Sequence, residues 1–153
     1  MAKKGGGMVW VLAVVAVGMG MTLPVQAVIN GRLRTALDDP IRAALVSVLV
    51  SSALMVVLAV ATWQPLPAGW VASSPWWVWM GGLIGALYVL GSLALVSRLG
   101  AAFLFALLVV GQMLSSVIVD HYGWLGVPVH AVNPWRLLGA AFLIAGVVLI
   151  RRF

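Results

Sequence analysis

The chain has 153 residues, of which 64% are hydrophobic and 8% are charged, with a formal net charge of +6. Soluble domains average about 45–50% apolar and about 25% charged residues, so this composition excludes an ordinary soluble domain and a separate soluble catalytic or nucleic-acid-binding domain. The lack of cysteine excludes disulfides, thiolate nucleophiles and cysteine-ligated metals. The sequence therefore predicts an integral membrane protein whose positive charges flank its membrane helices.

Five long uncharged runs follow one another along the chain. One bilayer crossing takes about 20 apolar residues, and in lipid a helix satisfies its backbone groups within the segment. The sequence therefore predicts an all-α integral membrane protein, with residues 1–153 in a single transmembrane domain of five transmembrane helices. The predicted spans are residues 8–30, 43–63, 76–97, 99–119 and 135–150.

Charged or proline-rich segments separate these runs. Arginines and aspartates follow the first run, and Pro40 is placed to start the second helix. Two prolines within residues 64–69 end the second run. Only residues 98–100 separate the third run from the fourth, so these two helices are predicted to form a tight antiparallel hairpin. The first run also resembles a signal peptide, but its length favours a retained helix.

The eight tryptophans give an independent check of this threading. If the chain alternates sides at each span, all eight lie on the side of the N-terminus, as expected of residues that prefer the headgroup level. Six arginines then collect on the opposite side, against three basic residues on the tryptophan side. This bias favours a cytoplasmic location for the arginine-rich side and leaves insertion in both orientations open.

The polar residues inside the predicted spans are neutral. No Asp, Glu, Lys, Arg or His lies near the middle of a span, so the midplane carboxylate typical of proton-coupled exporters is missing. Gln26 and Asn30 share one face of the first helix, and Gln112 lies in the fourth. A primary amide is costly to bury partly satisfied, so these amides indicate a hydrated cavity or a polar ligand. The alternative is that they bridge neighbouring helices.

Small and aromatic residues also recur at helical spacing. Glycine pairs on one helix face predict close helix packing. These pairs are Gly81 with Gly85 and Gly139 with Gly146. Tyr88 is either a core aromatic or a cavity wall. Trp79, at the head of the third span, either anchors the helix at the interface or stacks on a flat or cationic solute.

Asp120 and His121 end the fourth span together. A general-base role would require a nucleophile with an orienting group at readable spacing, and none accompanies them, so we expect no enzyme. Asp120 either caps the loop or pairs with Arg136. Asp120, His121 and Arg136 are candidates for a gate or an ion pair. His121 and His130 lack further ligands, so we expect no metal site and no cofactor.

The order of several short motifs carries a resemblance to a known family. Those motifs are Gln26-Ala-Val-Ile-Asn-Gly-Arg-Leu33, Gly81-Gly-Leu-Ile-Gly-Ala-Leu-Tyr-Val89, Leu99-Gly-Ala-Ala102, Gly111-Gln112, Asp120-His-Tyr-Gly123 and Arg136-Leu-Leu-Gly139. Over nearly its whole length the chain resembles the YdcZ-type five-helix inner-membrane proteins of the drug/metabolite transporter superfamily.

The resemblance implies a half-sized transporter in the bacterial inner membrane, a multi-pass protein that works in pairs. The pair is an antiparallel homodimer or a heterodimer with a related five-helix protein, with substrate at the midplane between the halves. The residues carried over by the resemblance are Gln26, Asn30, Tyr88, Gln112 and Asp120. Unlike the cation exporters of the superfamily, this chain has no acidic residue in its first helix, which argues against their proton-exchange mechanism.

Two functions fit these observations. The first is a transporter subunit that moves a small polar or cationic metabolite or drug across the inner membrane as an antiparallel dimer. The alternative is a non-transporting membrane scaffold or accessory subunit, in which the polar residues only join helices. The expected partners are the lipid bilayer, a second five-helix chain and a small-molecule substrate, with no nucleic acid.

Overall fold

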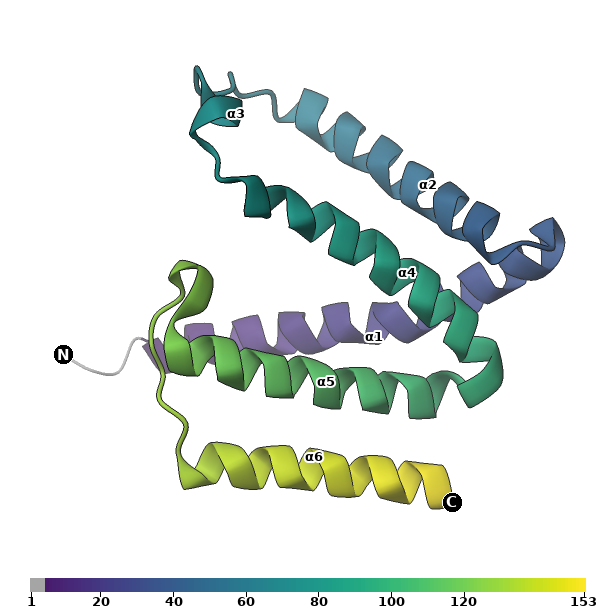
Figure 1. The fold of residues 1–153 in the computed structure, drawn as a ribbon, viewed down its shortest axis with the longest axis vertical. Helices are drawn as coiled ribbons and strands as arrows, with labels where there is room; N and C mark the ends of the chain where they lie inside the picture. Colours follow the sequence, from purple (N-terminus) through teal and green to yellow (C-terminus); the bar gives the residue numbers. More distant parts are fainter. Residues whose placement is uncertain (1–4) are drawn as a thin grey trace. The chain divides into compact units, whose positions relative to one another are not determined.

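The computed structural model describes residues 5–153, and their side chains from residue 7 onward. All regular structure in this range is helical (Figure 1). The long helices are α1 (Gly5–Leu37), α2 (Pro40–Ala61), α4 (Met80–Leu99), α5 (Ala101–Tyr122) and α6 (Pro134–Arg152). Short helical segments lie in the connections: α3 (Trp70–Ser73), η1 (Trp76–Trp79) and η2 (Trp124–Gly126).

Five helical segments are long and apolar enough to cross a membrane. They are Gly7–Leu37, Pro40–Ala61, Trp76–Leu99, Ala101–Tyr122 and Pro134–Arg152. The all-α membrane fold with five spanning helices is therefore confirmed. Each helix begins or ends within a few residues of its predicted bound, except at the end of the first.

The first helix continues beyond residue 30, where the predicted membrane span ends. The helix continues to Leu37, so the expected polar connection shrinks to Asp38 and Asp39. The apolar run stops where the bilayer would stop, but the backbone continues its helix because arginine is a good helix former and favours the negative end of the helix dipole. At about 1.5 Å per residue, the 33 residues of α1 extend about 50 Å, beyond the roughly 30 Å of a hydrocarbon core.

The chain divides into two compact units, one ending at Arg98 and the other beginning at Leu99. We call them unit 1 and unit 2. Gly100, with φ of 76°, is the one residue between α4 and α5, a backbone conformation that glycine adopts without strain. The tight hairpin of these two helices and the single transmembrane domain both stay predictions.

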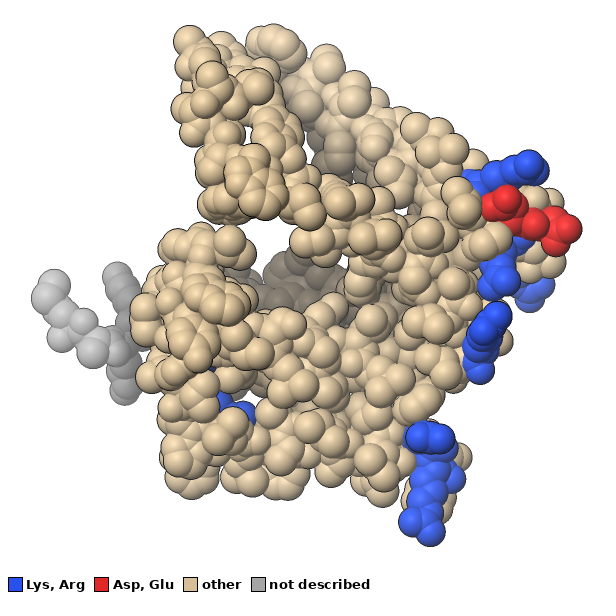
Figure 2. All heavy atoms as spheres, in the orientation of Figure 1, with Lys and Arg blue, Asp and Glu red and all other residues tan. Residues whose placement is uncertain are grey.

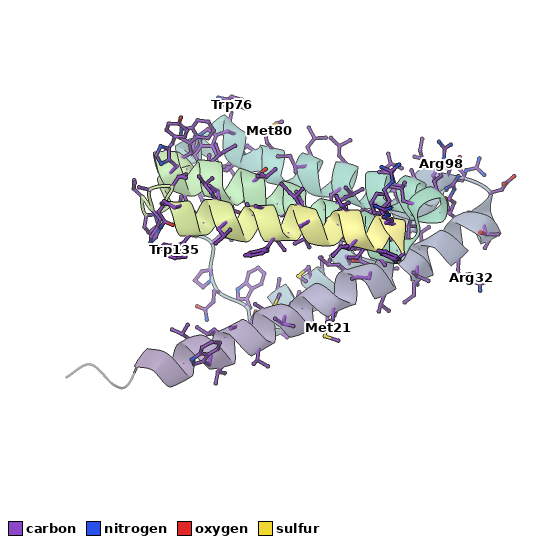
Figure 3. All side chains as sticks on the ribbon, turned by 90° about the horizontal axis from the view of Figure 1, so that it is seen from below. Met21, Arg32, Trp76, Met80, Arg98 and Trp135 are labelled. Atoms are coloured by element: carbon purple, nitrogen blue, oxygen red, sulfur yellow. The ribbon has the colours of Figure 1, made fainter. Side chains whose placement is uncertain are left out.

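Unit 1 has a small core at one end. Its buried residues lie at the end of α1, the start of α2 and the end of α4: Ala27, Asn30, Ala43, Ala44, Leu93 and Val96. Three of these six residues are alanines, which lets the helices approach closely where two residues join α1 to α2. Figure 3 places Arg32 and Arg98 at this end of unit 1 and Trp76 and Met80 at the other. The large apolar side chains nearer the other end, such as Trp10 and Val60, are exposed.

Proline interrupts the hydrogen bonding of α1 without ending the helix. Pro24 lies inside α1 and has no N–H to donate to the carbonyl four residues earlier. Next to it, the Thr22 hydroxyl donates to the Met19 carbonyl at 2.7 Å. The helix therefore remains continuous with one backbone bond fewer.

Unit 2 is a pair of packed helices, α5 and α6, with Leu104 and Ala140 buried. Asn133 caps α6, because its side-chain oxygen accepts from the Arg136 N–H at 2.9 Å, and Pro134 occupies the first helical position. Near the end of α6, the Arg151 guanidinium lies 5.9 Å from the centre of the Phe103 ring.

Asp39 caps the start of α2. Its Oδ1 accepts from the backbone N–H of Ile41 at 2.6 Å and of Arg42 at 2.9 Å. The bond from the Arg42 N–H is the largest influence that holds the pKa of Asp39 below its usual value; partial burial opposes it, and the Ile41 N–H and the Arg42 charge lower the pKa further. The folded protein therefore favours the ionised carboxylate.

We predict that Asp39→Ala lowers the thermal unfolding midpoint of the purified protein at pH 7. A folded-state pKa below the unfolded value contributes stability that is present above about pH 3.9 and is lost as the pH falls through the folded pKa. The gap between wild type and Asp39→Ala should therefore narrow below about pH 4. Asp39→Asn keeps an oxygen for both amides, so its deficit should be smaller and its midpoint should lack the acid-dependent fall. An equal deficit for Asn and Ala would contradict capping by the side-chain oxygen.

Candidate functional site

Asn30 joins α1 to α2. It is only 7% exposed, and its Nδ2 donates to the Ser47 hydroxyl at 3.0 Å. The buried alanines Ala27 and Ala43 lie on the same two helices and allow the close approach that this bond requires. For Asn30 the structure shows a bridge between neighbouring helices, which is one of the two roles considered for the amides.

Gln26 has a different environment one turn earlier on α1. Its side chain is exposed and has no hydrogen-bond partner in the described part of the chain. It lies about three turns before the end of α1, inside a candidate membrane span. An amide exposed to hydrocarbon loses its bonds to water without replacing them, which costs several kcal/mol on transfer scales, roughly 2–7. Within a membrane Gln26 therefore requires a partner beyond unit 1.

Gln112 repeats this situation on α5 in unit 2. Its side chain is exposed, while its backbone carbonyl accepts from the Ser116 hydroxyl at 2.7 Å. Ser116 thus satisfies its hydroxyl within its own helix, as Ser51 does on α2 by donating to the Ser47 carbonyl at 3.0 Å. The Gln112 side-chain amide, by contrast, makes no hydrogen bond to a carbonyl of its own helix. The approach of Gln112 to Gln26 and Asn30 stays a prediction.

The aromatic candidates of unit 1 lie on α4 and the segment before it. Tyr88 is half-buried on α4, with its hydroxyl oxygen enclosed. Trp79 is 51% exposed and lies against Trp70, with ring centres 5.5 Å apart and ring planes at 42°. The exposed part of this tryptophan pair is free to meet headgroups or a flat solute.

Asp120 and Arg136 form an ion pair in unit 2. Arg136 Nη1 lies 3.2 Å from Asp120 Oδ2 and donates at 3.2 Å to the His130 carbonyl. The His130 N–H donates in turn to the Asp120 carbonyl at 2.8 Å. We call these three residues the Asp120 clasp. The clasp ties the loop between α5 and α6 to the ends of both helices.

His121 fastens the same loop. Its Nδ1 accepts from the Val132 N–H at 3.2 Å, which requires that this nitrogen carry no proton. Its ring meets the Tyr122 ring edge-on, with ring centres 4.8 Å apart, and the Tyr122 ring stacks on that of Trp124 with ring centres 5.2 Å apart. Within the described residues no three His, Cys, Asp or Glu side chains gather as a metal site would require.

The predicted packing glycines face open space. A Cβ built on them would meet no atom within 4 Å in the described structure. This holds for Gly81, Gly85, Gly139 and Gly146. Close helix packing by these glycines therefore has no partner among the described residues of their own units and stays a prediction.

Sequence reasoning missed three contacts of these surroundings. Ser47 as the partner of Asn30, the Arg34–Ser97 bond and the His130 backbone each join segments far apart in sequence, so no local spacing reveals them. The cap of α6 is different, because Asn133 directly before Pro134 is a recognisable helix start.

We predict that Gly123→Ala destabilises the protein more than Gly126→Ala. Both glycines have positive φ, 62° and 84°, so both variants carry the strain of a left-handed residue, about 1–2 kcal/mol. Only at position 123 would the new Cβ meet a neighbour closely, Val129 Cγ2 at 2.6 Å. Chemical or thermal unfolding of the two variants measures the difference.

The double variant Gly123→Ala/Val129→Ala isolates the clash, because it removes the methyl that the new Cβ meets. It should recover part of the loss seen in Gly123→Ala. Equal destabilisation of Gly123→Ala and Gly126→Ala would show that the packing of Val129 against the end of α5 contributes nothing.

Comparison with known proteins places this arrangement in a family. The family model described as "Putative inner membrane exporter, YdcZ" matches residues 10–149. The inner membrane protein YdcZ of Escherichia coli (strain K12) is 28% identical over 144 residues, which cover 90% of this chain and 91% of that protein. No solved structure matches the chain. The family description is that of a transporter rather than an enzyme, and with five spanning-length helices the chain is a multi-pass inner membrane protein. Because the family model matches nearly the whole chain, this protein belongs to the YdcZ family of inner membrane proteins.

Proposed function

We propose that the chain is one half of an inner-membrane transporter that moves a small polar or cationic metabolite or drug as an antiparallel dimer. The observation that carries the proposal is the exposure of Gln26 and Gln112, two amides inside membrane-spanning helices without side-chain partners in the described chain. Both amides then line a hydrated path between two copies. The exporter description of the family supports the same conclusion.

Pairing of two copies follows from what one copy leaves uncovered. Its glycine faces are open, and small residues at such faces let helix backbones approach. Five spans put the two ends of a chain on opposite sides, so two copies in opposite orientations reproduce the inverted repeats of larger transporters. In such repeats the substrate lies near the midplane between the halves, at the depth that suits membrane-embedded amides.

The substrate class follows from the chemistry of the candidate site. Gln26, Asn30 and Gln112 donate and accept hydrogen bonds without carrying charge, which suits a polar solute. Trp79 adds an exposed aromatic face, and a cation over such a face gains roughly 0.5–2 kcal/mol. The Asp120 clasp acts as a gate in this proposal, because breaking its half-exposed ion pair removes one of the contacts that hold the loop between two spans.

A scaffold or accessory subunit is the second candidate. The observation that favours it is the Asn30–Ser47 bond, in which a predicted substrate-binding amide joins two helices of the chain. If Gln26 and Gln112 do the same between chains, the protein holds an assembly together and moves no solute.

We predict that Gln26→Ala and Gln112→Ala abolish transport while leaving the unfolding midpoint near that of wild type, because neither side chain has a partner in the described chain. Asn30→Ala should instead destabilise the protein by about 0.6–2 kcal/mol through loss of the bond to Ser47. Flux is measured in proteoliposomes with quaternary ammonium, guanidinium and uncharged polar solutes, and stability by thermal unfolding.

Ser51→Ala serves as the matched control, since Ser51 is also exposed on a spanning helix but satisfies its hydroxyl within that helix. It should keep both flux and stability. If no solute class moves in wild type, or if the glutamine variants lose assembly rather than flux, the scaffold function replaces the transporter.

We predict that the protein inserts in both orientations. Single cysteines introduced near each terminus of the cysteine-free chain should react with membrane-impermeant reagents from both sides of intact cells in equal measure. Labelling from one side alone would contradict an antiparallel homodimer and favour a heterodimer.

The glycine face provides a separate test of pairing. Gly139→Leu should reduce the dimer fraction in detergent without unfolding the chain, because the single copy has room for a side chain there. Gly20→Leu, also in open space, is the control for an added leucine.

A further inference from the structure

A polar crevice opens where three helices of unit 1 end or begin. Its volume is about 340 Å³, within the roughly 300–1,000 Å³ typical of small-ligand sites. The end of α1, the turn into α2 and the end of α4 supply its lining: Gly31, Arg34, Thr35, Asp38, Pro40 and Ser97. The crevice lies at the ends of the candidate spans, and its lining includes none of the residues named for the proposed substrate path.

Arg34 gives the crevice its chemistry. The guanidinium is half-buried, and its Nη1 donates to the Ser97 hydroxyl at 3.1 Å. Within the described residues no carboxylate lies within 4 Å of it, although Asp38 also lines the crevice. Four of its five N–H groups remain for a ligand. A planar guanidinium with free donors matches the oxygens of a phosphate group.

Ser97 adds a second donor. Its oxygen accepts from Arg34, and in the described structure its own O–H donates to no acceptor. The Thr35 hydroxyl differs, because it donates to the Gly31 carbonyl at 3.2 Å. The crevice thus presents the free N–H groups of Arg34 and one hydroxyl proton side by side, and the Asp38 carboxylate in its lining does not pair with Arg34. These free donors suit an anion.

The charge around the crevice is positive. The described part of unit 1 holds four arginines and two aspartates, a balance of +2. The Asp39 carboxylate is already hydrogen-bonded to backbone N–H groups at the start of α2. Arg32 and Arg98 are exposed at the same end of unit 1 (Figure 3). Figure 2 shows blue side chains gathered around the red aspartates of this turn. The surrounding field therefore attracts anions.

We propose that this crevice binds the phosphate of an anionic phospholipid headgroup. Lipid is the occupant because the crevice lies where the apolar spans stop, at the depth of the headgroups, and basic pockets between membrane helices hold such groups. In this proposal Arg34 donates to one non-bridging phosphate oxygen of the diester, and the Ser97 hydroxyl donates to the other. The bound lipid bridges α1 and α4 across the small core of unit 1.

The test measures lipid binding by the purified full chain. Native mass spectrometry counts bound phosphatidylglycerol and phosphatidylcholine over a titration, and thermal unfolding is followed with each lipid and with inorganic phosphate alone. We expect phosphatidylglycerol to bind and to raise the unfolding midpoint of wild type, and phosphatidylcholine and inorganic phosphate to do neither. Arg34→Gln should weaken phosphatidylglycerol binding about tenfold or more, as expected for losing a charged hydrogen bond.

Arg152→Gln is the matched control, because it removes the same charge at an exposed residue outside the crevice and should bind like wild type. Ser97→Ala keeps every charge and should also bind phosphatidylglycerol more weakly than wild type. It tests the proposal if Arg34→Gln fails to fold. Equal binding by Arg34→Gln and Arg152→Gln, or by Ser97→Ala and wild type, overturns the proposal. Equal stabilisation by phosphatidylcholine or by inorganic phosphate overturns the assignment to an anionic lipid.

Discussion

A hydrogen-bonding group placed in hydrocarbon must find its partner inside the protein assembly, since no water is there to replace it. The backbone of this chain meets the requirement by forming helices. The hydroxyls of Thr22, Ser51 and Ser116 meet it by donating to carbonyls of their own helices. Asn30 meets it across two helices through Ser47. Gln26 and Gln112 do not meet it within the described part of their own units, so the function of the protein is to be sought where these amides are.

The distribution of order in unit 1 follows from the same constraint. Where α1 turns into α2, small residues are buried, Asp39 caps the second helix and Arg34 bonds to Ser97. Toward the other ends of these helices the side chains are apolar and exposed, as lipid-facing residues are. One end of the unit is therefore held by specific polar contacts, and the other is free to repack against lipid or a second copy.

The fold could be predicted from the sequence because bilayer thickness sets the length of each apolar run. The end of α1 could not, because hydropathy marks where lipid stops and says nothing about the helix that continues into water through Arg32 and Arg34. Spacing by four placed Gln26 and Asn30 on one helix face, but it could not tell that Ser47 of another helix would bond to one amide and leave the other exposed. Contacts between distant segments depend on the angle at which two helices cross, and a single sequence does not reveal this crossing angle.

Pro24 adds a mechanical property to the longest helix. Because proline has no N–H, the carbonyl four residues earlier lacks its helical hydrogen bond, so α1 can bend at this level. Gln26 lies two residues after Pro24. Asn30, which is hydrogen-bonded to Ser47 of α2, lies one turn further along the helix. Bending at Pro24 would therefore move the exposed first half of α1 relative to the part that carries Gln26 and is anchored to α2 through Asn30.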